Sequence, residues 1–330
     1  MRRLLFVAAC GSVAVVPALV SASPLPNAPN CRIFPADNPW NQRVDTLPVA
    51  KNSARLIASI GLGDPVHPDF GTTYAGAPNG IPFAVVSGST PRVSVSFMYA
   101  SESDGRRYPL PRNVPIEGGP RATGDRHVIV VDRSTCTDYE LFDAHPLAHG
   151  SCSPPARHPA SLNRGAHESS GCWHAGSGAI FNLRSDHLRP AGRTSADAAG
   201  LPILPGLARY DEVARGVIDH ALRFTAPCTA ARYVYPARHE ASTCSRFAAP
   251  MGLRVRLKAS VTISRLPYQA RVVAEALKRY GLLLADNGSP WYISGAPDRR
   301  SKDGALHQLD RLSGRDIEVV DTSSLPHPGR

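Results

Sequence analysis

Short apolar runs, each closed by proline or glycine, are the feature that most constrains the fold of this chain. Its 330 residues include 31 prolines and 27 glycines, which lie between the runs rather than in repeats. Proline cannot donate to a sheet ladder and glycine favours turns, so most elements are limited to short strands joined by turns. The pattern predicts a β-rich chain: a mainly antiparallel sandwich or jelly-roll-like body with helical insertions, α+β in class.

Several runs have the β-branched and aromatic composition of strands. They are residues 81–87, 92–100, 126–132, 137–143, 178–183, 217–225, 231–236 and 252–264. Helical patterns cover residues 52–60, 194–200, 208–216 and 267–281. The last has an apolar stripe, formed by Val272, Val273, Ala276, Leu277 and Tyr280. We expect a single secreted domain over residues 23–330, with a more helical part from about residue 265.

Residues 253–263 alternate strictly between apolar and polar side chains. The alternation predicts a strand with one buried face, and it places Arg254, Arg256 and Lys258 together on the other face. Like charges on one strand face repel one another, so this face needs solvent or an anionic partner. We interpret the row as either a solvated face or a surface that binds an acidic polymer.

Residues 1–22 have the composition of a secretory leader. Arg2 and Arg3 form a positive n-region, residues 4–20 an apolar stretch, and residues 20–22 a small-residue cleavage site. We expect cleavage near Ala22 and a secreted or periplasmic protein with no membrane span, because no later stretch is long and apolar enough.

The cysteines after the leader form an even set, which in an exported chain predicts disulfides. They are Cys31, Cys136, Cys152, Cys172, Cys228 and Cys244. Sequence cannot fix the connectivity. The nearest-neighbour hypothesis pairs Cys152 with Cys172, Cys228 with Cys244, and Cys31 with Cys136, which would pin an N-terminal strap (residues 31–45) to a strand.

Five histidines lie between His145 and His174, which raises the question of a metal site. Zinc sites use tight ligand spacings, whereas these intervals are irregular and contain prolines. We interpret the segment as a disulfide-closed surface loop and expect no metal and no cofactor, with a metal-dependent protein using this loop as the weaker alternative.

Several carboxylates have local structural explanations. Thr194 and Asp197 fit a capping box at a helix start. Asp286, followed by Asn287 and Gly288, fits a hairpin turn, and Asp298 fits a helix N-cap. We therefore place these residues behind others as catalytic candidates.

The remaining candidates lie on predicted strands. The catalytic candidates are His127, Glu140, Asp143 and His220, because carboxyl and imidazole groups perform acid–base chemistry. His220 also fits a hydrogen-bonded core histidine. Substrate binding is assigned to Arg254, Arg256, Lys258 and Trp291, with Trp40 and Trp173 as further sugar platforms.

Many short motifs along the chain resemble an uncharacterised family of secreted bacterial proteins. They include CRIFPADNPWN, GDRHVIVVDRSTC, YELFDA, TSADAAGLPILPG, HALRFT, MGLRVRLKAS and LADNGSPWYISG, and span about residues 31–320. The resemblance implies secretion but transfers no activity. The segment 145–174 looks longer than the family's link, and Arg193 stands where tryptophan is expected.

The expected function is action on an extracellular polysaccharide, as a glycoside hydrolase or as a lyase on an acidic glycan. The net charge of +10, less the two charges of Arg2 and Arg3 once the leader is cleaved, favours acidic partners such as a cell-wall polymer. A host whose proteins are generally rich in arginine explains it equally well. The alternative is a non-catalytic protein that binds a cell wall or an anionic polymer. No specific kinase or nucleotide-binding motif is present, and we expect no nucleic-acid partner.

Overall fold

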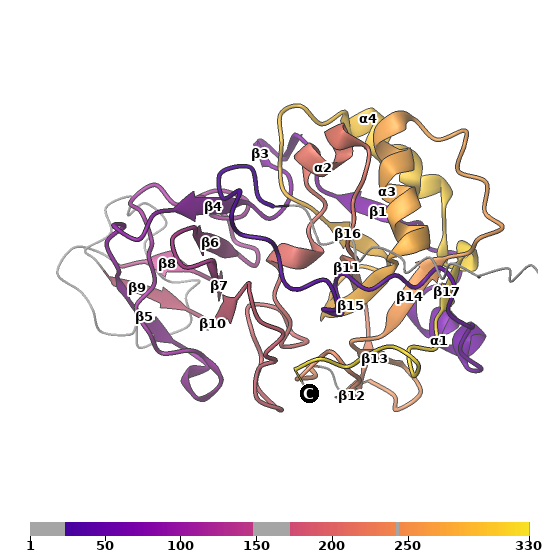
Figure 1. The fold of residues 1–330 in the computed structure, drawn as a ribbon, viewed down its shortest axis with the longest axis horizontal. Coiled ribbons are helices and arrows are strands. Elements are labelled where there is room, and N and C mark those ends of the chain that lie inside the picture. Colours follow the sequence, from indigo (N-terminus) through magenta and orange to yellow (C-terminus); the bar gives the residue numbers. More distant parts are fainter. Residues whose placement is uncertain (1–23, 148–171, 242–243, 330) are drawn as a thin grey trace, which may run out of the picture.

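The computed structural model describes residues 24–147, 172–241 and 244–329. Strands make up 28% and helices 16% of the described residues, and most strand pairs are antiparallel, which confirms a β-rich α+β fold. Figure 1 shows the sheets of residues 83–182 at one end of the molecule and a larger sheet, accompanied by the α-helices, at the other end. The predicted leader lies outside the described residues.

The larger sheet has six strands in the order β1-β16-β11-β15-β14-β17. Its central strand, β11, runs parallel to β15 and antiparallel to β16. The bounds are β1 His67–Asp69, β11 Leu222–Ala226, β14 Arg254–Leu257, β15 Leu282–Asn287, β16 Tyr292–Ser294 and β17 Ile317–Val319. Because β11 lies between β15 and β16, the hairpin predicted at residues 286–288 is wrong: the two flanking strands are not paired with each other.

A second sheet of four strands, in the order β10-β7-β6-β4, forms the other main body. All five residues of β6 are buried, as expected for a short β-branched run covered on both faces. The bounds are β4 Phe83–Val86, β6 Val128–Asp132, β7 Thr137–Phe142 and β10 Ser177–Asn182. Local sequence patterns predicted each of these strands.

Smaller sheets complete the strand inventory of the described residues. They comprise β5 Ser94–Phe97 with β9 Cys172–Ala175 and β8 His145–Pro146, β12 Thr229–Tyr233 with β13 Ala249–Met251, and β2 Thr73–Tyr74 with β3 Ala77–Pro78.

The α-helices are α1 Ser53–Ile60, α2 Tyr210–Arg215, α3 Tyr268–Arg279 and α4 Asp303–Leu306. Short 3₁₀ helices are η1 Ala100–Glu102, η3 Leu204–Gly206, η4 His307–Arg311 and η5 Gly314–Asp316. The predicted apolar stripe of α3 is buried, which confirms that helix. The helix predicted at 194–200 is wrong, since these residues form turns. No helix within the described ranges has the length and apolar character needed to cross a bilayer.

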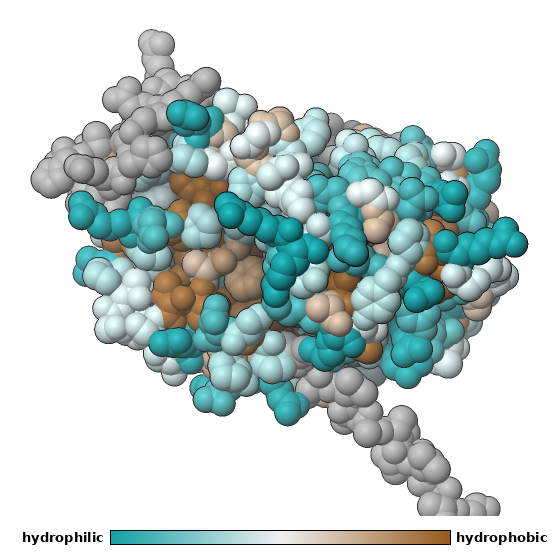
Figure 2. Space-filling view, turned by 90° about the horizontal axis from the view of Figure 1, so that it is seen from above, coloured by the Kyte–Doolittle hydropathy of each residue, from teal (hydrophilic) through white to brown (hydrophobic). Residues whose placement is uncertain are grey.

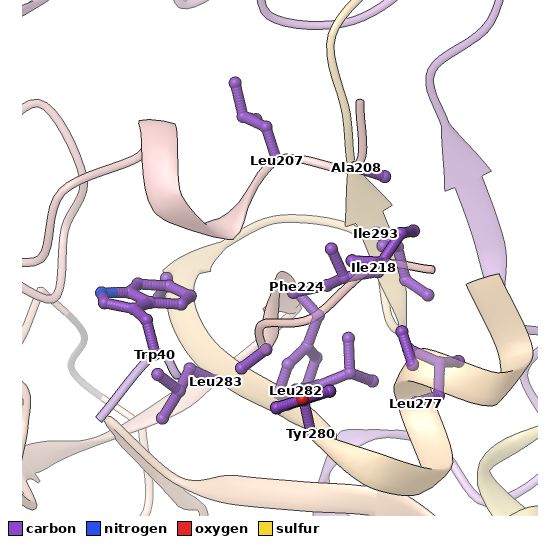
Figure 3. Close-up of a cluster of buried hydrophobic side chains, with 14 of the residues drawn as sticks. Trp40, Leu207, Ala208, Ile218, Phe224, Leu277, Tyr280, Leu282, Leu283 and Ile293 are labelled. Carbon is purple, nitrogen blue, oxygen red and sulfur yellow. The ribbon is translucent and has the colours of Figure 1, made fainter. Parts of the chain in front are cut away.

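Aromatic and aliphatic side chains from both sequence halves meet in the core of the larger sheet (Figure 3). Trp40, from the strap, packs over Gly206, where an added β-carbon would lie 2.8 Å from Trp40 ring carbons and 2.9 Å from the β-carbon of Arg223. Hydrophilic side chains dominate the face in Figure 2, and apolar ones gather in limited patches, which is ordinary for a globular surface.

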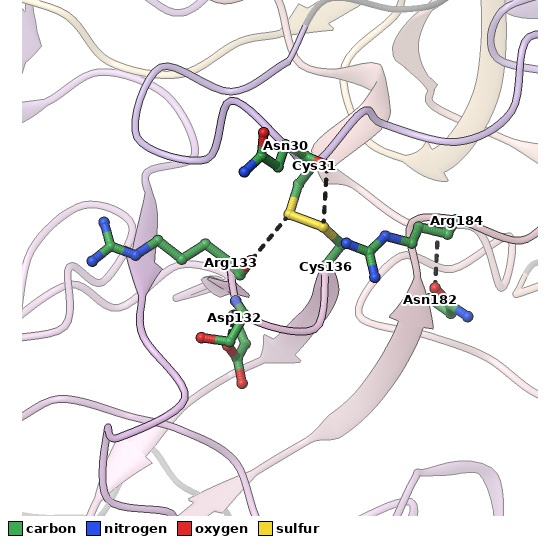
Figure 4. The surroundings of a disulfide bond; sticks show 8 residues. Asn30, Cys31, Asp132, Arg133, Cys136, Asn182 and Arg184 are labelled. Carbon is green, nitrogen blue, oxygen red and sulfur yellow. Dashed lines mark hydrogen bonds between the residues drawn. A yellow bond between two sulfur atoms is a disulfide. The ribbon is translucent and has the colours of Figure 1, made fainter.

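Two predicted disulfides are confirmed. Cys31–Cys136 has a Cα–Cα distance of 5.2 Å, and Cys228–Cys244 one of 5.9 Å. The first joins the strap to the turn between β6 and β7, where the Cys31 sulfur lies 3.4 Å from the carbonyl oxygen of Arg133 (Figure 4). Cys152 lies outside the described residues. Disulfides are typical of exported proteins.

Candidate functional site

A buried ion pair joins Arg223 on β11 to Asp197. Nε of Arg223 donates to Asp197 Oδ2 at 2.9 Å and Nη2 donates to Oδ1 at 2.7 Å, while Nη1 donates to the hydroxyl of Ser294 on β16. The side chains of Arg223 and Asp197 are 4% and 0% exposed. Burial of ionised groups is costly unless their partners satisfy them, so the two-point geometry is what keeps both charges in place.

Asp286, near the end of β15, is a second carboxyl group beside the same guanidinium. Its Oδ2 lies 3.5 Å from Nη2 of Arg223, and its side chain is 21% exposed. Burial raises the pKa of Asp286 well above its usual value, the charge of Asp197 raises it further, and Arg223 only partly opposes this. Asp286 therefore keeps its proton to higher pH than an ordinary aspartate, as a proton donor must.

His127, just before β6, is held as a cation. Its Nδ1 lies 2.7 Å from Glu117 Oε2 and its Nε2 lies 3.1 Å from the carbonyl oxygen of Ala196. Both partners are acceptors, so both ring nitrogens carry hydrogens. Burial lowers the pKa of His127, but the charge and hydrogen bond of Glu117 outweigh it and raise the pKa to about 9. His127 is thus a poor proton acceptor at neutral pH.

The pKa of Glu117 is lowered, whereas that of Asp286 is raised. Burial raises the pKa of Glu117, but the charge and hydrogen bonds of His127 prevail and leave that pKa below its usual value. Its side chain is 26% exposed, so an ionised carboxylate reaches the surface here.

Two exposed carboxylates, Asp69 on β1 and Asp125, complete the group. Asp69 interacts electrostatically with Glu117, Asp125 and Arg223, and Asp125 also acts on Asp286 and His127. We call the whole set the junction cluster, because it draws on both main sheets. Its members are Asp69, Glu117, Asp125, His127, Asp197, Arg223 and Asp286.

The segment 194–204 connects the two sheets at this cluster. Ala196 accepts the hydrogen bond of His127, Asp197 holds Arg223, and the backbone N–H groups of Ile203 and Leu204 donate to Glu140. The capping-box interpretation of Asp197 is therefore wrong: its carboxylate binds a distant arginine and caps no helix.

Glu140 on β7 is enclosed. It is 0% exposed, and its oxygens lie 2.8–2.9 Å from the N–H groups of Ile203 and Leu204, at the start of η3. Burial raises the pKa of Glu140 despite these bonds, and the neighbouring Asp138, also buried, has a pKa well above its usual value because of burial and the Glu140 charge. The geometry gives Glu140 a role in holding η3.

Asp143 lies beside the junction cluster, since its N–H donates to the carbonyl of Asp125 at 2.7 Å. Its carboxylate lies 2.7 Å from Nε2 of His145, and both side chains are 14% exposed. On the neighbouring strand, Nδ1 of His174 lies 2.9 Å from the hydroxyl of Ser96. Most of the histidine-rich segment, residues 148–171, lies outside the described residues.

His220 does not belong to the junction cluster, because its hydrogen-bond partners lie elsewhere. It precedes β11, is 1% exposed, and its nitrogens lie 2.8 Å from the carbonyl of Ala221 and 3.2 Å from Glu212 on α2. Glu212 also accepts from Arg209. This arrangement matches the hydrogen-bonded core histidine that the sequence left open.

The structure corrects the expectation that Arg254 and Arg256 lie on a solvent-exposed or polymer-binding strand face. β14 ends at Leu257, and all four of its residues are buried. Arg254 donates to the carbonyls of Pro39, Gln42 and Tyr280 at 2.6–3.0 Å, and burial lowers its pKa to about 9.

Arg256 is bound in the same way as Arg254. It donates to Glu318 at 2.8 Å and to the carbonyls of Val44 and Leu47. Lys258, which is partly exposed, donates to the carbonyl of Arg315 at 2.6 Å. Arg254 and Arg256 thus hold the N-terminal strap and its continuation in place instead of facing solvent.

The tryptophans are not sugar platforms either. Trp40, Trp173 and Trp291 are 2%, 3% and 0% exposed. Trp291 stacks on Phe224 with ring centroids 5.3 Å apart, and its Nε1 donates to the carbonyl of Gly61 at 2.6 Å. A sugar platform must expose a ring face, and none of these three buried tryptophans does so. All three are core residues.

Sequence reasoning placed Asp197 and Asp286 behind other candidates because local rules explained these carboxylates. It did not single out Arg223, whose partners lie far away in the chain, or Glu117, Asp69 and Asp125. Among the described residues, one group has the donor types and spacing that could hold a metal ion. It consists of His67, at the start of β1, and of His307 and Asp310 on η4. No protein-family model, curated protein or solved structure matches the chain.

Proposed function

We propose that the protein is a hydrolase of extracellular polysaccharide that acts through the junction cluster. The observation that carries this proposal is the opposite perturbation of two carboxyl groups that both interact electrostatically with Arg223: the pKa of Asp286, which contacts Arg223, is raised, and that of Glu117, which is paired with His127, is lowered. Glycoside hydrolysis needs one carboxylic acid that donates a proton and one carboxylate that stays ionised. Asp286 is assigned as the acid and Glu117 as the carboxylate.

The charge of the cluster favours a neutral glycan over an acidic one. Four of its carboxyl groups reach solvent, at Asp69, Glu117, Asp125 and Asp286, whereas Arg223 is 4% exposed and already paired. An acidic rim repels uronates. The lyase variant of the function also loses its support, since Arg254 and Arg256, which the sequence assigned to binding of an acidic substrate, are buried.

The test is a panel of neutral and uronic polysaccharides incubated with the full mature chain. Hydrolysis is read from new reducing ends, and elimination from the absorbance of unsaturated products. We expect reducing ends from a neutral glycan, and Asp286→Asn and Glu117→Gln each to lower the rate by about 100-fold or more.

The control variant is Asp186→Asn. Asp186 is also a partly buried aspartate with a raised pKa, but it accepts its hydrogen bond from Asn38, away from the cluster. Its activity should match the wild type. Equal activity of Asp286→Asn and wild type on a substrate that is turned over would reject the assignment, and unsaturated products would replace the hydrolase by a lyase.

A second candidate, binding of an anionic polymer, is favoured by a separate surface groove. It has a volume of about 480 Å³ and is lined by Arg43, Arg256, Lys278 and Arg279 together with Asp45 and Glu275. These cations already have partners, such as Asp45 for Arg43 and Glu275 for Arg279. Binding would therefore be weak and salt-dependent. Pull-down by an anionic polymer that is lost in Arg43→Ala/Arg279→Ala would support it, and unchanged pull-down would reject it.

A further inference from the structure

Two histidines and an aspartate from separate elements meet at one edge of the larger sheet. His67 lies on β1, and His307 and Asp310 lie on η4. One ligand atom from each residue lies within 4.8 Å of the others. Nδ1 of His67 is 3.4 Å from Asp310 Oδ1, and Nδ1 of His307 is 3.5 Å from Asp310 Oδ2.

These separations suit a shared ion better than direct hydrogen bonds. Nitrogen–oxygen hydrogen bonds are usually about 2.7–3.2 Å long, so the carboxylate satisfies neither ring well. Ligand atoms at about 2.1 Å from a tetrahedral metal lie about 3.4 Å apart. The distances of 3.4 Å from His67 Nδ1 to Asp310 Oδ1 and of 3.5 Å from His307 Nδ1 to Asp310 Oδ2 are each close to that edge length, and the carboxylate presents one oxygen to each ring.

The backbone holds the two elements together at this point. The N–H of Val66 donates to the carbonyl of Leu312 at 2.8 Å, directly before His67 and just after η4. The ring of His67 packs against Tyr292 of β16, with centroids 4.3 Å apart and the ring planes tilted by 35°. His307 and Asp310 are three residues apart on a 3₁₀ helix, where such side chains lie above one another. The ligands are therefore positioned before any ion binds.

We propose that His67, His307 and Asp310 bind a divalent first-row transition metal, with Zn²⁺ as the best fit. Two imidazoles and one carboxylate are a donor set for such metals, whereas Ca²⁺ and Mg²⁺ require oxygen ligands. The side chains are 25%, 43% and 39% exposed, which leaves room for water or a substrate oxygen at the remaining position. This proposal does not depend on the hydrolase proposal.

The test measures Zn²⁺ binding by calorimetry on chelator-treated mature protein. Because residues 148–171 add His149, His158 and His167, all variants are made in a background in which these three are changed to Gln. We expect one Zn²⁺ per chain, tetrahedral Co²⁺ absorption bands on cobalt substitution, and no competition by Mg²⁺ or Ca²⁺.

His307→Ala should weaken Zn²⁺ binding by more than about 100-fold, because even residues that only support metal ligands typically contribute 10–100-fold. Asp310→Asn is the second variant, and denaturation without zinc checks that both fold. The matched control is His239→Ala: His239 lies 3.5 Å from Glu102 and is 22% exposed, but belongs to no three-ligand group of the described residues. Unchanged Zn²⁺ affinity in His307→Ala and Asp310→Asn, or no Zn²⁺ binding by the background protein, would overturn the proposal.

Discussion

Two hydrogen bonds of 2.7 and 2.9 Å join the guanidinium of Arg223 to the carboxylate of Asp197. Arg223 lies on β11 of the larger sheet, whereas Asp197 lies in a turn outside any strand. The pair fixes segment 194–204 against β11, and that segment also contacts His127 and Glu140. The ion pair is therefore one of the contacts that position the junction cluster, together with those of Ala196 to His127 and of Ile203 to Glu140.

Asp197→Asn should destabilise the protein by about 3–5 kcal/mol, because it leaves the Arg223 charge buried with a weaker partner. Denaturant unfolding followed by tryptophan fluorescence measures this. Asp45→Asn is the control, since Asp45 pairs with Arg43 at the surface and exposed pairs contribute no more than about 1 kcal/mol. A similar small effect in both variants would contradict the central role of the buried pair.

Gly206→Ala should destabilise the protein by about 1–3 kcal/mol through overpacking. The new methyl group would lie 2.8 Å from Trp40 ring carbons and 2.9 Å from the β-carbon of Arg223. Gly304→Ala, in α4, has no atom within 4 Å of the added carbon and should be neutral or slightly stabilising. Equal melting temperatures for the two variants would show that the Trp40 packing is looser than described.

Local sequence patterns correctly predicted the strands and the helix whose formation depends on residues close together in the chain. The strands at 83–86, 128–132 and 137–142 and helix α3 follow from periodicity, since each buries a face that its own sequence defines. The pairing of Cys31 with Cys136 was part of the nearest-neighbour hypothesis, one of the connectivities that the sequence left open, and the structure confirms it.

Long-range polar contacts account for what local patterns could not predict. Thr194 and Asp197 fit a capping box, yet Asp197 binds Arg223, 26 residues away in the chain. The alternation around Arg254 and Arg256 is real, but the N-terminal strap covers the face that it marks as polar. Neither outcome is visible in a window of a dozen residues, because the partner lies elsewhere in the sequence.

Removing Cys31–Cys136 should cost more stability than removing Cys228–Cys244. The first closes a sequence separation of 105 residues and the second one of 16. In the chain-entropy model these loops correspond to about 4.7 and about 3 kcal/mol. Double Cys→Ala variants of each pair, compared by denaturant unfolding, measure the order. A larger loss from the short loop would mean that native packing around Cys228, rather than loop closure, dominates.

The ion pair between His127 and Glu117 should make stability depend on pH above neutrality. The pKa of His127 rises from 6.5 to about 9 on folding, because the charge and hydrogen bond of Glu117 outweigh burial. A group whose pKa is raised by folding stabilises the folded state fully below its unfolded pKa. The contribution is therefore complete below about pH 6.5 and is lost as the pH rises toward about 9. Free energies of unfolding measured from pH 6 to 10 should fall across this window by about 2–3 kcal/mol relative to His127→Gln, in which the titrating group is absent. The difference between the two proteins isolates His127 from other groups that titrate near pH 9. A difference that stays constant from pH 6 to 10 would show that His127 is neutral in the folded protein over this range. Only one ring nitrogen would then carry a hydrogen, so His127 could donate to Glu117 or to the carbonyl of Ala196, but not to both.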